Sequence, residues 1–329
     1  MGELEFRDFQ ANDRDAILGL LAQGRPASYL EEKRAVFDWQ FAQNPAPGPS
    51  PFIVGTAGGA IVAVNGLMSV VARVHGVAQT ACWSLDTYVS SAHRGRGFGK
   101  ALIARVTEAS PTMLGFGISD LSDPILEKAG WVADPAMTTV FYHANETGLR
   151  GIAKNLLTRS SRGLRARRAG TIAHIAVSPP PAAEELDETW ARVCEHYPNA
   201  VVRDGRYLGW RYRDAPKLRY RWVTARRDGV LLGALITRHH PVESAVVDYV
   251  GPLDDPSTLA SLLEVGCGDL VASGTQRIRC ESNDPAVLEE LLAVGFVRAR
   301  VSGRFRVHAA VPGRWFVMTG DSDNDLMVL

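Results

Sequence analysis

Residues 93–102 read HRGRGFGKAL and place three glycines among two arginines and a lysine, directly before an apolar stretch at helical spacing. Glycines lack Cβ atoms, so their main-chain amides can approach an anion closely and adopt positive φ. The start of a helix points unpaired N–H groups at the same anion. Basic side chains pair with phosphate oxygens. The segment therefore predicts a pyrophosphate cradle made by residues Arg94, Gly95, Arg96, Gly97, Phe98, Gly99 and Lys100.

Two better-known phosphate loops do not fit this spacing. A dinucleotide-binding loop that starts at Gly95 needs its third glycine where Lys100 stands. A P-loop needs a glycine where Arg94 stands and a hydroxyl residue where Ala101 stands. The remaining pattern is R-x-x-G-x-G, and its alternative is an ordinary glycine-rich turn with solvated arginines.

The elements around this loop are expected to be strands and helices in alternation. Apolar residues alternate in the strands and recur every three or four positions in the helices. The expected strands lie at 3–9, at 50–71 as two strands around a Gly-Gly turn, and at 80–90, 113–118 and 131–144. The expected helices lie at 30–43, 99–110 and 122–130, with an earlier one ending near residue 23. The loop thus follows a strand and begins a helix.

On these residues the sequence resembles the GNAT acetyltransferases, whose signature [RQ]-x-x-G-x-[GA] follows the fourth strand. VSSAHRGRGFGKAL at 89–102 looks like that motif, and ILEKAGW at 125–131 is similar to the family's LYEKLGF segment. The resemblance covers about residues 1–145. It implies acetyl-CoA or another acyl-CoA as co-substrate and no metal. It also implies that the backbone of Tyr88 and Val89 pairs with the pantetheine arm, while the strands at 80–90 and 113–118 splay to leave a slot for the thioester.

Acyl transfer to an amine needs a proton acceptor, a stabilised oxyanion and a proton for the leaving thiolate. Asp86, in the strand before the loop, is the first candidate base, directly or through water. Its alternative role is a structural pair with an arginine. Asp120 is a second candidate, with a loop or helix-cap role as its alternative. The tyrosine that often protonates CoA in this family is replaced by Leu126. The acid is then absent, or is Tyr88, Tyr142 or solvent.

After residue 170 the pattern of the first half begins again. Four matches occur in the same order: WQF at 39–41 with WRY at 210–212, GG at 58–59 with DG at 228–229, DTYV at 86–89 with VDYV at 247–250, and 122–131 with 283–296. Four ordered matches indicate two copies of one fold.

The predicted fold class is therefore α/β (α+β), with two tandem GNAT-like domains. Each is expected to be a mixed, mostly antiparallel twisted sheet flanked by helices. We expect an acyl-CoA-binding domain at 1–145, a basic helical linker at 146–170, a degenerate GNAT-like domain at 171–312 and a C-terminal tail at 313–329. The second copy has GPLDDPST at 251–258 where the glycine loop should be. Its carboxylates would repel pyrophosphate, so no CoA is expected there.

Composition narrows the partners. Lys+Arg and Asp+Glu both number 36, which gives no argument for nucleic acid. Four widely spaced cysteines, no leader-like N-terminus and no long apolar run favour a cytoplasmic protein without disulfides. The basic stretch 150–168 is either a solvated linker helix or a helix on an anionic membrane surface. The acidic tail is expected to contact basic groups such as those at 159–168.

The function expected from these observations is acyl-CoA-dependent N-acylation of a primary amine by direct attack. The acceptor is a small molecule or an amino sugar, because the WQF, AGW and WFVMTGDSD segments look like those of tandem members associated with amino sugars and surface polysaccharides. An amino acid or an antibiotic is also compatible. The alternative is a CoA-binding, non-catalytic or regulatory protein.

Overall fold

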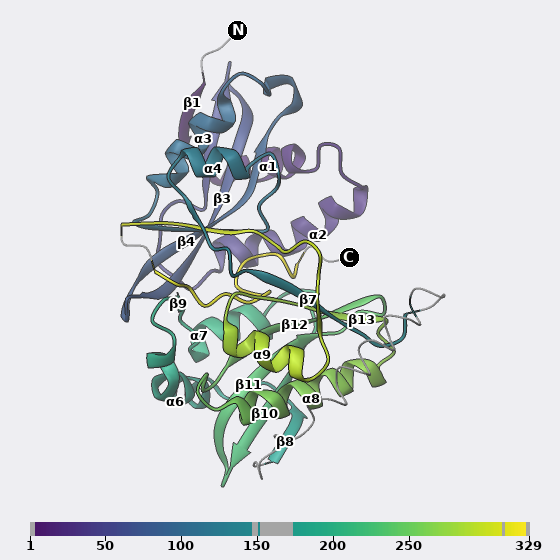
Figure 1. Ribbon diagram of the computed structural model, residues 1–329. Coiled ribbons are helices and arrows are strands. Elements are labelled where there is room, and N and C mark those ends of the chain that lie inside the picture. The colour runs from purple at the N-terminus through teal and green to yellow at the C-terminus, as the bar shows by residue number, and fades with distance from the viewer. Residues whose placement is uncertain (1–3, 147–150, 152–173, 311–312, 327–329) are drawn as a thin grey trace.

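The computed structural model describes residues 4–146, 151, 174–310 and 313–326. Two twisted sheets lie one above the other, each with helices packed on it (Figure 1). Most strand pairs are antiparallel, and each sheet has one parallel pair. The predicted fold class is confirmed. Most of the linker expected at 146–170, including its basic residues 152–168, lies outside the described residues.

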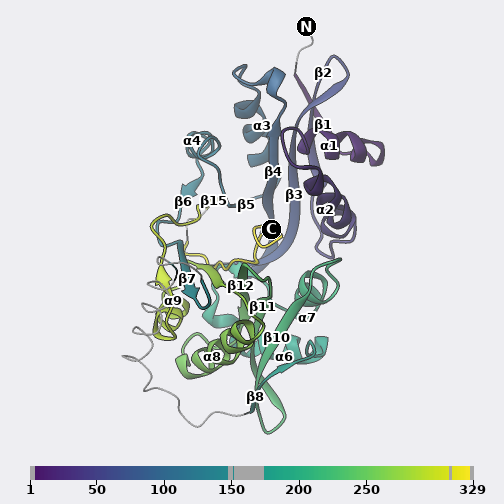
Figure 2. The same cartoon turned by 90° about the vertical axis from the view of Figure 1, so that its right-hand side faces the viewer.

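The first sheet carries the glycine loop. Its strand order is β1 (Glu5–Asp8), β2 (Phe52–Ala57), β3 (Ala60–Val74), β4 (Val77–Val89), β5 (Thr112–Phe116), β15 (Phe305–Ala309) and β6 (Val132–Ala133). The short β9 (Ala200–Val201) also pairs with β3. Helices α1 (Arg14–Leu21) and α2 (Ala27–Phe37) cover one face. Helices α3 (Phe98–Thr107) and α4 (Asp123–Lys128) lie on the opposite side (Figure 2).

Alternation along β2 explains why both faces are covered. Ile53 packs with α3, whereas Phe52 and Val54 pack with α1 and α2. Successive side chains of a strand point to opposite faces, so an apolar run without polar interruptions requires cover on both sides.

The second sheet has the order β14 (Val297–Arg298), β7 (Thr138–His143), β13 (Arg277–Ser282), β12 (Glu243–Val250), β11 (Val230–Arg238), β10 (Tyr220–Arg227) and β8 (His174–Ser178). Its helices are α6 (Ala183–Val193), α7 (Gly205–Leu208), α8 (Pro256–Ala272) and α9 (Pro285–Ala293). The same kinds of elements thus follow one another in both halves of the chain.

The two halves exchange a strand, which the predicted boundaries did not anticipate. Strand β7, from the first half, pairs with β13 over six residues of the second sheet. Strand β15, from the second half, pairs with β5 over five residues of the first sheet. The boundaries at 145 and 312 therefore do not separate the two sheets. Apolar alternation identifies a strand, but it does not say which of two similar open edges that strand will join.

A pair of tryptophans marks the contact between the two copies. Trp39 and Trp210 lie in matching single-turn π-helices, Asp38–Ala42 and Gly209–Arg213. Their rings stack with centroids 5.0 Å apart. Each indole Nε1 donates to the other residue's carbonyl oxygen, at 3.0 and 3.1 Å. Because each tryptophan makes the same contact with the other, the two copies are related at this point by an approximate two-fold axis, as in an isologous contact.

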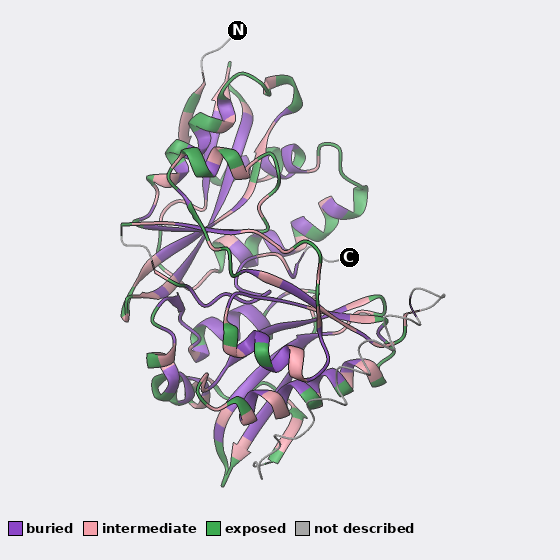
Figure 3. Ribbon diagram, viewed as in Figure 1, coloured by how far each residue is buried: buried purple, intermediate pink, exposed green. Residues whose placement is uncertain are grey.

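The apolar core is continuous between the sheets. Buried positions occupy the strands of both sheets (Figure 3). One cluster of buried side chains includes Trp39 and Trp83 of the first half together with Trp210 and Trp222 of the second. Two smaller clusters lie under α3 and under α1 and α2. Because of the shared core and the exchanged strands, we expect the halves to fold together. Within the described residues, no helix has the length and apolarity needed to cross a membrane.

Candidate functional site

The glycine loop forms an open helix N-terminus. After β4, a short 3₁₀ turn at Ser91–His93 leads to Gly95 and Gly97, which have φ of 74° and 82°. Gly97 is the N-cap of α3, and no side chain caps this helix. The N–H groups of the first turn have no carbonyl partner inside a helix, so those of residues 98–100 are available to an anion. The loop is largely exposed.

The basic side chains of the loop rest on aromatic rings. The Arg94 guanidinium lies 5.2 Å from the Tyr88 ring centroid and donates to Val89 O at 3.1 Å. The Arg96 guanidinium lies 5.0 Å from the Phe98 ring centroid. Cation–π contacts of this kind orient the guanidinium groups beside the open amides. The arrangement can hold a pyrophosphate by main-chain donors and by charge.

Strands β4 and β5 separate where a thioester would need space. Their parallel pairing consists of Cys82 with Met113 and Trp83 with Leu114. β4 continues to Val89, and β3 pairs with it on its other side. In the part of the chain that the structure describes, no strand pairs with residues 84–89 along the β5 side. This free edge can accept the amide groups of a pantetheine arm, as β-strand addition does.

Asp86 lies in a β-bulge of β4. Val64 pairs with Tyr88 and Gly66 with Leu85, so β4 has one residue more than β3 in this interval. Asp86 has a φ of 50°, which is uncommon for a residue other than glycine. Such bulges re-aim side chains and often lie next to active sites. Here the bulge brings the carboxylate against α2.

The Asp86 carboxylate meets a buried lysine. Lys33 Nζ of α2 lies 2.6 Å from Asp86 Oδ2 and 3.7 Å from Asp323 Oδ2, and it donates to Gln40 Oε1 at 3.2 Å. The three charged side chains are 2%, 6% and 13% exposed. Burial by itself would lower the pKa of Lys33, but the two carboxylates outweigh it and raise that pKa to about 12. Lys33 is therefore an ammonium ion at neutral pH.

Asp323 is the less tightly held carboxylate of this cluster. Burial raises its pKa, and the repulsion from Asp86 adds to that effect, while the attraction of Lys33 lowers it. Tyr29, one turn before Lys33, has a buried hydroxyl without a hydrogen-bond partner among the described residues. Burial is also the main reason that the Tyr29 pKa is raised. One cation, two carboxylates and one unsatisfied hydroxyl thus share a buried space.

The C-terminal tail supplies the second carboxylate, and its aspartates contact basic groups, as expected. Asp321 pairs with Arg203 at 2.6 Å, and Asp325 pairs with Arg211. The tail's three aspartates each meet one buried cation of the body, whereas residues 159–168 lie outside the described part. Next along the tail, Asn324 Oδ1 occupies the place that a Cβ on Gly117 would need. The tail therefore passes the end of β5, beside the gap between β4 and β5.

The other predicted side chains do not gather at this gap. Asp120 is 88% exposed and pairs with Arg304 at 2.5 Å. The Tyr88 hydroxyl donates to Gln23 O at 3.3 Å. Leu126 is buried among apolar residues of α3 and α4. Tyr142 belongs to β7 in the second sheet, where its ring lies 5.6 Å from Phe296.

The sequence reasoning missed Tyr29, Lys33 and Asp323. A signal existed for Lys33, because it lies one helical turn before Val36 on the face that is buried. The acidic run of the tail is visible in the sequence, but the buried cations that it contacts, Lys33, Arg203 and Arg211, come from three separate segments. No sequence spacing links those segments.

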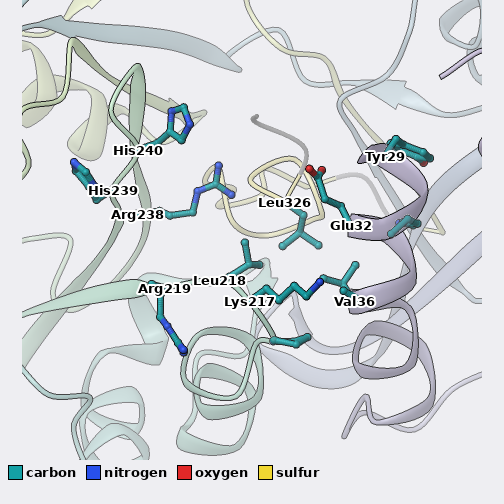
Figure 4. A pocket seen from close by; sticks show the side chains of 13 residues that line it. Tyr29, Glu32, Val36, Lys217, Leu218, Arg219, Arg238, His239, His240 and Leu326 are labelled. Carbon is teal, nitrogen blue, oxygen red and sulfur yellow. The ribbon is translucent and has the colours of Figure 1, made fainter. Parts of the chain in front are cut away.

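A cavity of about 400 Å³ opens beside the buried cluster. Figure 4 shows α2 on one side and the ends of β10 and β11 on the other, with Leu326 of the tail between them. Tyr29 and Lys33 line it from α2. Among the described residues, no group of three or more His, Cys, Asp or Glu side chains could hold a metal ion.

The corresponding loop of the second half is closed by its own side chains. Helix α8 is capped by Asp255, whose carboxylate accepts from the main-chain N–H and the hydroxyl of Ser257. The hydroxyls of Tyr197 and Tyr249 donate to Gly251 O and Pro252 O. The donors that would hold a phosphate in this position already face a carboxylate.

Comparisons with protein-family models and with curated proteins found no match. Comparison with solved structures found similar folds over almost the whole chain. A GCN5-related N-acetyltransferase from Kribbella flavida is 15% identical with a TM-score of 0.59, covering 93% of this chain and 71% of its own. One from Anabaena variabilis ATCC 29413 is 11% identical with a TM-score of 0.62, over 93% and 72%. Saccharomyces cerevisiae N-myristoyltransferase with bound myristoyl-CoA is 12% identical with a TM-score of 0.59, over 93% and 83%.

These identities are low enough that the likeness concerns the fold. It agrees with the open loop before α3, the divergence of β4 and β5, and the repetition of one sheet pattern in two halves. The chain has the fold of the GCN5-related (GNAT) N-acetyltransferases, in a tandem arrangement.

Proposed function

We propose that this protein transfers an acyl group from an acyl-CoA to a primary amine by direct attack of the amine on the thioester. The observation that carries the proposal is the uncapped N-terminus of α3 at the end of β4, whose edge toward β5 has no strand partner at residues 84–89 in the described part of the chain. These features can hold two neighbouring parts of CoA, the pyrophosphate and the pantetheine arm, in one line. Within the residues that the structure describes, the second half has no such uncapped loop, because Asp255 caps α8.

The residues of the loop have separate roles in this proposal. The amides of residues 94–100 hold the pyrophosphate, with charge from Arg94, Arg96 and Lys100. The backbone of Tyr88 and Val89 receives the pantetheine arm. An amide near Val89 polarises the thioester carbonyl, because a fixed donor aimed at the developing oxyanion lowers the barrier. The thiolate of CoA leaves and takes a proton from solvent, since Leu126 has no acidic group and the Tyr88 hydroxyl is engaged.

The proton of the amine goes to the carboxylates beside Lys33. Asp86 lies in the strand that borders the thioester slot, and its carboxylate is paired with Lys33 at 2.6 Å. Asp323 is farther from Lys33 and has a raised pKa, so it accepts a proton more readily. We therefore assign the base to the Asp86–Asp323 pair. Asp120 has no part in it, because its carboxylate is exposed and paired with Arg304.

The acceptor class in this proposal is a small molecule or an amino sugar that carries a primary amine. The cavity of about 400 Å³ beside the carboxylate pair supports a small acceptor. The protein is proposed to act in the cytoplasm, where acyl-CoA is available.

A second candidate function is binding of CoA without catalysis of acyl transfer. The specific observation in its favour is the 2.6 Å ion pair that holds Asp86. This contact also fits the alternative role of Asp86 as a structural ion-pair partner, with Lys33 in the place expected for an arginine.

The test is release of CoA thiol from acetyl-CoA over a panel of primary amines. We expect amine-dependent release, with a loss of at least about a hundredfold in Asp86→Asn and unchanged affinity for acetyl-CoA. Asp120→Asn is the matched control and should keep full activity. Binding of acetyl-CoA without release for any amine would favour the non-catalytic candidate. Absence of acetyl-CoA binding would reject both.

A further inference from the structure

We infer that the cavity between α2 and the second sheet is the acceptor site, and that it selects a molecule with a primary ammonium at one end, an apolar middle and an anionic group at the other end. The inference rests on the proposed function and adds the acceptor's chemical class. It is carried by the residues around the cavity, which differ in kind from one end to the other (Figure 4).

The cluster next to the cavity has a surplus of negative charge. Among the described residues, Lys33 is the one cation that pairs with Asp86 and Asp323, at 2.6 and 3.7 Å. With both carboxylates ionised, one negative charge remains unbalanced in a buried setting, which is costly unless a further cation pairs with it. The Tyr29 hydroxyl, buried and without a hydrogen-bond partner among the described residues, adds an unused acceptor. Tyr29 lines the cavity, whereas Asp86 and Asp323 adjoin it through their contacts with Lys33. A ligand ammonium at this end of the cavity would donate to the hydroxyl and be attracted by the net negative charge of the cluster.

The middle of the cavity is apolar. Val36 faces it from α2, Leu218 from the segment before β10, and Leu326 from the tail. Ala35 and Pro216 complete this part of the wall. An alkyl or similarly apolar linker buries its surface here without losing hydrogen bonds.

The wall opposite α2 is basic. It consists of Lys217, Arg219, Arg238, His239 and His240, and the one acidic residue that lines the cavity is Glu32. Lys217 and Arg219 are exposed, and the structure gives neither an ion pair within the described residues. A concave surface of one charge sign concentrates ligands of the opposite sign. A carboxylate or phosphate at the far end of the acceptor fits this wall.

The position of the cavity agrees with delivery of an amine to the thioester. The pyrophosphate loop begins α3, and α3 and α2 lie on opposite sides of the first sheet (Figure 2). Asp86 and Asn324 both lie where β4 and β5 separate. Lys33 of α2 lines the cavity and contacts Asp86 of β4, so the cavity lies on the α2 side of the first sheet, opposite the loop that begins α3.

The experiment compares three probes by calorimetry on the full chain with acetyl-CoA in excess at pH 7.5: 6-aminohexanoate, hexylamine and hexanoate. We expect 6-aminohexanoate to bind at least about tenfold more tightly than either single-ended probe. Asp323→Asn should weaken 6-aminohexanoate and hexylamine by a similar factor and leave hexanoate unchanged. Lys217→Glu with Arg219→Glu should weaken 6-aminohexanoate and hexanoate and leave hexylamine unchanged. Arg227→Glu, on the same hairpin and away from the cavity, is the charge control.

A blocking variant separates this inference from the proposed function. Leu218→Trp fills the cavity, so it should abolish binding of 6-aminohexanoate and retain acetyl-CoA affinity. Equal affinities for the three probes, or binding that survives Leu218→Trp, would overturn the inference while the acyl-CoA site stands. Loss of acetyl-CoA binding in the unaltered protein is the separate failure of the proposed function.

Discussion

Helices α3 and α8 occupy matching places in the two halves, yet their first turns differ. Helix α3 starts at Gly97 with no side-chain cap, and helix α8 starts after Asp255, whose carboxylate accepts from Ser257. Both carboxylate caps and bound anions satisfy the same unpaired N–H groups. The residue type at the N-cap, glycine or aspartate, therefore decides whether the first N–H groups of the helix are open to a ligand or already bonded.

The carboxylates of the two bulges differ in the same way. β12 also has a bulge after its pairing with Ile236, and there Asp248 accepts from Arg203 and from the Tyr212 hydroxyl, both at 2.9 Å. Arg203 also binds Asp321, and all three charges are fully buried. The first-half cluster has the same composition, one cation and two carboxylates, but it borders a cavity. In both clusters one carboxylate comes from a bulged strand and the other from the C-terminal tail, and only one of the two clusters is fully buried.

The largest expected effect comes from breaking the fully buried cluster of Arg203, Asp248 and Asp321. Arg203→Met removes the shared partner of two buried carboxylates and should lower the free energy of unfolding by about 3–5 kcal/mol. Lys33→Met should cost less, because its partners Asp86 and Asp323 are 6% and 13% exposed, whereas Asp248 and Asp321 are fully buried. Guanidinium chloride unfolding at pH 7 measures both. A greater loss for Lys33→Met would contradict the distinction between a sealed and an open cluster.

The prediction of intermediate size compares alanine substitutions at two glycines that have nearly the same φ. Gly97 and Gly229 have φ of 82° and 83°, and an added Cβ would meet nothing within 4 Å at either. Alanine at either place should therefore cost a similar stability, about 1 kcal/mol. Gly97→Ala alone should weaken acetyl-CoA binding, by at least about tenfold, because it displaces the open amides.

Calorimetric titration of acetyl-CoA, with thermal unfolding of both variants, checks this prediction. Equal acetyl-CoA affinity in Gly97→Ala and Gly229→Ala would mean that the loop is only a turn.

The smallest expected effect is the pH dependence of the stability that the Asp255 cap gives to the start of α8. Burial acts to raise the pKa of Asp255, but hydrogen bonds from Ser257 and Thr258 lower it more, so that the folded-state pKa is below 3.8. The cap therefore stabilises the folded state above pH 3.8, and this stability is lost as the pH falls through the folded-state pKa. Asp255→Ala should cost about 1 kcal/mol at pH 7.

Comparing urea unfolding at pH 7 and pH 2.5 measures this effect. The difference between the unaltered protein and Asp255→Ala should shrink at the lower pH. Asp254→Ala, at a neighbouring exposed carboxylate, should behave like the unaltered protein at both. A difference that persists at low pH would mean that the cap does not act through its charge.

Local sequence explains the parts of the site that one segment builds. Gly95 and Gly97 have positive φ and precede an apolar helical pattern, so the loop could be predicted without the fold. Asp255 could be recognised as unfavourable for phosphate for the same reason. The repeated WQF and WRY segments identified two copies, and their tryptophans do meet.

What the sequence determined by itself is the kind of element at most of the described places and the glycine-rich turn that begins α3, because these depend on residues close together in the chain. Only the tertiary structure decided that β7 and β15 exchange sheets, since several strand edges accept the same apolar pattern. It also decided that Lys33, Asp86 and Asp323 share one buried space. The interaction of charges depends on distance and burial, and distance between remote segments is set by how the whole chain packs.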